Sequence, residues 1–288
     1  MRKAFSTFQS MAIAISIVAS MASCYTYTYK KTPCKLVITL DDYCKEGYNL
    51  YVAEHVNWVS SDSLLAHYSV DDIGGKIIWQ PTKDTWNVVF MDKEQKNCIF
   101  DFRYDIKSEE QTISYVPRLI LENERGILEK QNLMFKNAIE QYGDSLRYDP
   151  DYGRPNFDFV RIDDKTTRMY MLQGVERTVI IPFGNDLSID FDNEGNITAF
   201  RRYHRSFIPV SNDGEAAIHS HLKDNPYITP TDVCNFLLYR GNMKQTYILS
   251  TALGGYIVYD AERKHATYLS KSAMKKVSKK NKKANRTN

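Results

Sequence analysis

Short runs of β-branched and aromatic residues recur along this 288-residue chain, and polar turns separate them at intervals of about ten residues. In the first half of the chain these runs occupy residues 36–40, 77–79, 86–90, 98–102 and 112–116. The pattern is typical of an antiparallel sheet or sandwich, and the 20 tyrosines add side chains that favour strands. We therefore expect sheet structure from residue 35 onward.

The same pattern resumes after a segment rich in Pro, Gly and Asp at 148–155. The later runs occupy residues 157–162, 168–172, 178–181, 186–191 and 197–203. The last two flank a turn that contains Gly195, which predicts a hairpin. We place an N-terminal β-rich region at 35–147 and a C-terminal β-rich region at 148–270.

One amphipathic helix interrupts the strand pattern between about residues 119 and 142. The residues that follow the spacing of one helix face are Ile127, Leu128, Gln131, Met134, Phe135, Ala138, Ile139 and Tyr142. Gly143 is a suitable C-terminal stop. We expect this apolar face to pack in the core. The predicted fold class is β-rich α+β, with antiparallel sheets and one long amphipathic helix near the middle of the chain.

The N-terminus has the three parts of a secretory signal peptide. Arg2 and Lys3 supply positive charge, residues 11–22 supply a short apolar stretch, and small residues then precede Cys24. The stretch is too short to span a membrane, and no other segment reaches 18 apolar residues. We predict a signal peptide at 1–23 and a tether at 24–34.

The sequence Met21-Ala22-Ser23-Cys24 resembles a bacterial lipobox, in which the cysteine is acylated and becomes the new N-terminus. The resemblance implies lipid attachment at Cys24 and anchoring in the cell envelope. Because no acidic residues follow Cys24, it also implies a protein that faces the periplasm. The alternative is ordinary cleavage near Ser23, with Cys24 a free or disulfide-bonded cysteine.

Four cysteines remain when Cys24 is set aside: Cys34, Cys44, Cys98 and Cys234. In an oxidising compartment they allow two disulfides, and buried thiols are the alternative. The sequence leaves both open.

The net charge of +3 is unevenly distributed, because residues 271–288 hold many Lys and Arg residues and no acid. We read this segment as a disordered, solvated tail, with attraction to anionic lipid headgroups as the sharper alternative. Nucleic-acid binding conflicts with export. The predicted partners are the membrane, through lipid on Cys24, and an envelope protein or glycan.

A candidate metal site lies in the C-terminal region. His219 and His221 are two residues apart, so on a strand they point to the same face with Cα atoms about 6–7 Å apart. Asp232 follows after a loop. Two histidines, one carboxylate and a water make a reasonable catalytic zinc shell. The alternative is that the histidines are surface or hydrogen-bonding residues and that Asp232 caps a turn.

The spacing of this segment resembles the motif of the JAMM metallopeptidases, which have the MPN+ fold. That motif is His-Ser/Thr-His, seven residues, Ser, two residues and Asp. Here His219-Ser220-His221 is followed by seven residues, Thr229, two residues and Asp232. The resemblance implies that His219, His221 and Asp232 are zinc ligands and that Thr229 takes the place of the family's serine. Thr229 and Pro230 also suit a helix start.

The chain departs from that family at the general base. The family uses an upstream glutamate, for which Glu176 is the only tolerable candidate. Glu215 lies on the same strand face as His219, but roughly 13 Å away. Leu222 replaces the proline usual after the second histidine. We assign no catalytic residue.

Two function hypotheses follow. The first is a non-enzymatic envelope lipoprotein that binds a periplasmic partner, and it predicts that the two histidines do not converge with Asp232. The second is a zinc-dependent hydrolase, and it predicts that His219, His221 and Asp232 converge near a further carboxylate. An immunity or inhibitor protein is a third idea. The histidines at 55, 67, 204 and 265 look isolated and receive no role.

Overall fold

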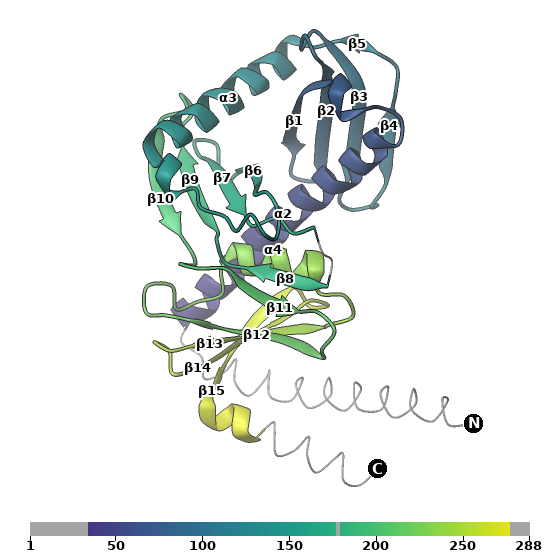
Figure 1. Ribbon diagram of the computed structural model, residues 1–288. Helices are drawn as coiled ribbons and strands as arrows, with labels where there is room; N and C mark the ends of the chain where they lie inside the picture. Colours follow the sequence, from purple (N-terminus) through teal and green to yellow (C-terminus); the bar gives the residue numbers. More distant parts are fainter. Residues whose placement is uncertain (1–33, 177–178, 277–288) are drawn as a thin grey trace, which may run out of the picture.

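The computed structural model describes residues 34–176 and 179–276 (Figure 1). The predicted signal peptide, Cys24, almost all of the tether and the last part of the basic tail lie outside these residues. Helices combine with several sheets in a strand-rich α+β fold, as predicted. None of the helices formed by the described residues is long and apolar enough to cross a membrane.

The described chain begins with a long helix that the sequence pattern did not predict, α2 (Cys34–Leu65). The strand expected at 36–40 is wrong, because its apolar run is only the first part of a helical stripe. That stripe continues through buried Cys44, Leu50, Val56 and Leu64. The fold therefore contains two long helices rather than one.

The N-terminal sheet is antiparallel, as predicted. It has the strand order β1-β2-β3-β4, and β5 pairs with β3. The strands are β1 (Ile73–Thr82), β2 (Thr85–Asp92), β3 (Asn97–Asp105), β4 (Gln111–Ser114) and β5 (Arg118–Leu119), and a 3₁₀ turn, η1 (Val70–Asp72), leads into them. The C-terminal half of α2 packs on this sheet, where Val56 and Leu64 join a core built around Trp86, Phe100 and Phe102.

The amphipathic helix predicted near 119–142 is present as α3 (Glu122–Tyr142), and Gly143 caps its end. Figure 1 shows α3 running from the N-terminal sheet to a second sheet. Leu128 packs with the N-terminal strands, while Met134 and Ala138 join the core of the second sheet. The buried stripe is narrower than expected, since Ile139 is 45% exposed.

The second sheet is antiparallel, with the strand order β10-β9-β7-β6. A 3₁₀ turn, η2 (Gly143–Ser145), precedes its strands, which are β6 (Asn156–Arg161), β7 (Thr167–Leu172), β9 (Leu187–Phe191) and β10 (Ile197–Arg202). The predicted hairpin is the β9–β10 pair, and Gly195 in its turn has a φ of +84°. A separate two-stranded ribbon joins β8 (Ile180–Phe183) to β11 (Ile208–Ser211).

The last sheet corrects the expectation of purely antiparallel pairing. Its order is β12-β13-β14-β15, and β12 (Ala216–His221) runs parallel to β13 (Gln245–Ser250). Parallel pairing requires a crossover connection. That connection is α4 (Pro230–Tyr239), a helix that begins where Thr229 and Pro230 predicted.

Antiparallel strands β14 (Gly255–Asp260) and β15 (His265–Ser270) complete the last sheet. The tail predicted to be disordered from residue 271 is helical over residues 271–276. Ser270 caps the N-terminus of this short helix, because its hydroxyl oxygen accepts a hydrogen bond from the backbone N–H of Ala273 at 3.2 Å.

Helix α2 contacts both predicted regions. Its N-terminal half packs against α4 and β15 in a second core, with Leu40 and Cys44 beside Phe236. A Cβ atom at Gly47 would lie 2.6 Å from Val233 Cβ and 2.7 Å from the Pro230 carbonyl oxygen. Glycine at this position therefore lets α2 and α4 approach closely.

Three of the cysteines are buried free thiols, namely Cys44, Cys98 and Cys234. For these three, the structure bears out the buried-thiol alternative. Burial raises the pKa of Cys98 to about 11. A thiol in this state is a poor nucleophile, so its part in the fold is packing.

Two buried acids meet where α2, β1 and β6 join. Glu54 and Asp158 are almost completely buried, and the partly buried ammonium group of Lys76 faces them. Burial raises the pKa of Asp158 to about 6. Burial and the repulsion of Asp158 raise the pKa of Glu54 well above its ordinary value. One ammonium group cannot balance two carboxylates, so the pair retains a proton near neutral pH.

This pair predicts a pH-dependent stability. A carboxyl whose pKa is raised by folding stabilises the protein while protonated, so the stabilisation is complete below about pH 4 and is lost as pH rises through about 6 and above. We expect Glu54→Gln to raise the melting temperature relative to the parent by roughly 2–6 °C at pH 8, with a smaller difference at pH 5. The exposed Glu129→Gln is the control. A difference in melting temperature between Glu54→Gln and the parent that is the same at pH 5 and pH 8 would contradict the assignment.

Candidate metal centre

Local sequence rules place three of the centre's side chains. Strand β12 alternates exposed and buried residues, so His219 and His221 point to the same inner face, as predicted. Thr229 is the N-cap of α4 and Pro230 its first residue, also as predicted. Asp232 occupies the third helical position, where its carboxylate accepts a hydrogen bond from the backbone N–H of Thr229 at 2.8 Å.

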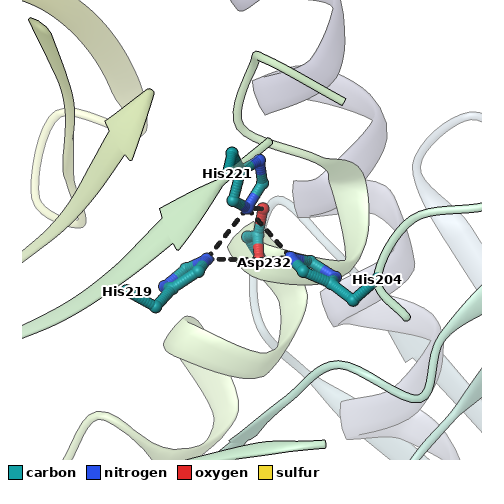
Figure 2. A group of neighbouring side chains, drawn as sticks. All are labelled: His204, His219, His221 and Asp232. Carbon is teal, nitrogen blue, oxygen red and sulfur yellow. Dashed lines mark hydrogen bonds and ion pairs between the residues drawn. The ribbon is translucent and has the colours of Figure 1, made fainter. Parts of the chain in front are cut away.

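These three side chains converge, so the separation that the non-enzymatic hypothesis predicted is wrong, and a fourth residue, His204, joins them (Figure 2). The Nε2 atom of His221 lies 2.9 Å from that of His204 and 3.0 Å from that of His219. Asp232 Oδ1 lies 3.1 Å from His219 Nε2 and 3.5 Å from His204 Nε2. All four side chains are buried, and one potential ligand atom from each lies within 4.8 Å of the others.

His204 corrects the sequence interpretation, which gave this residue no role. It follows β10 and reaches the centre from a different sheet than β12. No local motif marks it, because it lies in the loop after β10 and only tertiary packing brings it to the other ligands. Its neighbour in space, Asp186, was missed for the same reason.

The outer hydrogen bonds of two imidazoles fix their tautomers. His204 Nδ1 lies 2.8 and 3.0 Å from the two carboxylate oxygens of Asp186, and His221 Nδ1 lies 2.6 Å from the carbonyl oxygen of Tyr227. Both partners only accept, so each Nδ1 carries the proton and donates it. In the neutral rings, Nε2 then presents a lone pair, and two lone pairs face each other across 2.9 Å. A cation between them removes this repulsion.

The spacing of the four atoms suits a tetrahedral metal ion. Zinc binds imidazole nitrogen and carboxylate oxygen at about 2.0–2.2 Å, so neighbouring ligands of a tetrahedron lie about 3.4 Å apart. The distances between 2.9 and 3.5 Å agree with this figure. Asp232 Oδ1 is buried and accepts no hydrogen bond of suitable geometry. The donor set of three nitrogens and one oxygen therefore fits zinc.

The charges around the centre favour positive charge at His204. Burial lowers the pKa of His204, but the carboxylates of Asp186 and Asp232 outweigh burial and raise it to about 9. Burial lowers the pKa of His219 below its ordinary value. Burial would raise the pKa of Asp232, but the three surrounding imidazoles hold it well below its usual range. A proton on His204 therefore supplies the positive charge when no metal ion does.

Asp186 supports His204 from outside the centre. It is fully buried and also accepts hydrogen bonds from the backbone N–H of His204 at 3.1 Å and from the hydroxyl group of Thr231. A divalent ion, Asp232 and Asp186 together carry no net charge when the imidazoles are neutral. Asp186 thus orients His204 and would balance the charge of such an ion in the buried site.

The glutamates considered as general bases lie elsewhere. Glu215 and Glu176 are both exposed. Glu176 lines a separate pocket with Trp58 and Tyr239. The nearest further carboxylate, Asp186, binds the ring nitrogen of His204 that faces away from the other ligands. The described residues therefore place no free carboxylate at the centre.

Comparisons with known proteins give no match: no family model, no curated protein and no solved structure resembles the chain significantly.

The outer hydrogen bonds predict a role for Asp186 in metal affinity. We expect Asp186→Asn to weaken zinc binding by about 10- to 100-fold, because His204 loses its anionic partner and the site loses one balancing charge. Competition with a chromophoric chelator measures the dissociation constant. Asp164→Asn, at an exposed aspartate, is the control and should leave affinity unchanged. Equal affinity for Asp186→Asn and the parent would rule out this role.

Proposed function

We propose that the protein binds one zinc ion through His204, His219, His221 and Asp232, and that it acts as a zinc-containing protein of the bacterial cell envelope. The observation that carries the proposal is the convergence of three imidazole nitrogens and one carboxylate oxygen within 4.8 Å in a buried site. Hydrogen bonds to Asp186 and Tyr227 direct two of the imidazole lone pairs inward.

Four protein ligands favour a structural role for the ion. Structural zinc sites are closed by four side chains, whereas catalytic sites keep one position for water. The ligands come from the end of the β9–β10 hairpin, from β12 and from the first turn of α4. Zinc would therefore join three separate structural elements within residues 204–232.

The envelope location rests on the N-terminal sequence. The apolar stretch and Cys24 support export, lipid attachment and a position facing the periplasm. The strand-rich body then serves as a binding module for an envelope protein or glycan, and the basic tail adds attraction to anionic headgroups. The zinc site would stabilise this module.

A second candidate function is a zinc-dependent hydrolase of the JAMM type. It is supported by the position of His219 and His221 on a strand and of Asp232 in the first turn of a helix that follows. Zinc would supply an activated water with a pKa of about 7. Two features count against it: His204 fills the position that water needs, and Glu176 and Glu215 are exposed.

Elemental mass spectrometry on residues 25–288 tests the zinc site. We expect about one zinc per chain in the parent and less than a tenth of that in the His219→Ala/His221→Ala double variant, because two of the four ligands are lost. The exposed His67→Ala is the matched control and should retain zinc. A parent that holds no metal, after zinc is offered and the excess removed, would disprove the proposal.

A peptidase screen on the zinc-loaded parent separates the two candidates. A closed structural site predicts no hydrolysis above background and a lower melting temperature after chelation. Hydrolysis that disappears in the double variant would instead establish the hydrolase.

Metabolic labelling with an alkyne-tagged fatty acid tests the anchor. In a bacterial host we expect label on the full-length chain and none on Cys24→Ser, because the cysteine thiol is the acylation site implied by the lipobox resemblance. Cys34→Ser is the control and should be labelled like the parent. Equal labelling of Cys24→Ser and the parent would contradict lipid attachment at this residue.

A further inference from the structure

A pocket of about 390 Å³ adjoins the metal centre, and its size falls within the range of small-molecule sites. Two of the proposed ligands, His204 and His221, form part of its wall. The pocket therefore lies beside the centre rather than at a remote surface.

The charged groups of this pocket favour an anion. Arg202 and Arg205 line it, and Asp224 is its only acid. Arg205 is paired with Asp224 at 2.6 Å, in an exposed ion pair. Arg202 donates to the carbonyl oxygen of Ser145 at 2.5 Å and forms no ion pair among the described residues. One guanidinium group thus lacks a balancing carboxylate, and guanidinium binds carboxylate and phosphate oxygens in a fork.

Apolar side chains complete the lining. Ile208, Leu222 and the ring of Tyr203 contribute to it, and Leu222 is 57% exposed. A ligand with an apolar body would cover this surface while its anionic group meets Arg202.

A second pocket, of about 230 Å³, adjoins the first. The two pockets share Tyr203, Asp224 and Asn225. Asn225 fixes the backbone of two lining residues, because its side-chain amide donates to the carbonyl oxygens of Arg202 at 3.0 Å and Tyr203 at 2.7 Å. Arg201 lines the second pocket, with its guanidinium 6.0 Å from the centre of the Tyr203 ring.

We propose that the pocket beside the metal centre binds a small organic anion, with its carboxylate or phosphate on Arg202 and its apolar body on Ile208 and Leu222. This site goes beyond the proposed zinc site. Arg202 supplies its charge, so the anion does not depend on the zinc ion, although the two sites share the His204 and His221 side chains as a common wall.

Isothermal titration of the full chain with phenyl phosphate and with phenylacetate tests the proposal. We expect at least one of the two to bind, and Arg202→Gln to weaken that binding at least tenfold. Arg202→Lys, which keeps the charge, should recover part of the loss. Arg161→Gln, at an exposed arginine paired with Asp164, is the control. Inorganic phosphate and acetate should bind more weakly, because they lack the apolar body, and benzyl alcohol should not bind.

The same titrations on zinc-loaded and chelator-treated protein separate this proposal from the zinc site. Binding of an anion to a chain that never takes up zinc would overturn the zinc site and leave the anion site standing. Absence of binding by both phenyl compounds, or equal binding by Arg202→Gln and the parent, would overturn the anion site whatever the metal content.

Discussion

One electrostatic constraint governs the buried centre of the C-terminal half, because three imidazoles and a carboxylate together favour a cation. The four side chains are buried, and the acceptors behind His204 and His221 force the lone pairs of those two rings inward. Without positive charge this arrangement combines lone-pair repulsion with an unpaired buried carboxylate, and each is costly in a medium of low dielectric constant. A proton on His204 supplies the positive charge to only part of the cluster, whereas a zinc ion would bind all four groups at once.

The packing of two helices holds the carboxylate in place for this cluster. Asp232 lies in the first turn of α4, and Thr229 fixes its Oδ2 atom with a backbone N–H at 2.8 Å and a hydroxyl at 2.7 Å. The same turn lies under α2, where Gly47 allows the close approach to Pro230 and Val233. A side chain at Gly47 would therefore move the helix end that carries the ligand. The long helix missing from the sequence interpretation is thus part of the support of the site.

The sequence predicted those parts of the site that local geometry determines. Alternation along a strand puts His219 and His221 on one face, and Thr229 with Pro230 marks a helix start, whatever the rest of the chain does. His204 and Asp186 have no such local signal, since tertiary packing alone brings them to β12. The error at 36–40 has a related cause: five apolar or β-branched residues suit a strand equally well, and only the buried positions further along reveal the helical period.

His204 decides which chemistry the centre can support. If it binds the ion, all four positions are filled by protein and the site is closed, which suits a structural ion. Two contacts with Asp186, from the ring and from the backbone, hold this histidine, and Asp186 is itself held by Thr231. His204, one of the two ligands that line the neighbouring pocket, is therefore also held from its opposite side. An anion on Arg202 would meet the imidazole wall rather than the proposed ion, so the pocket would add recognition beside a metal that would stabilise the fold.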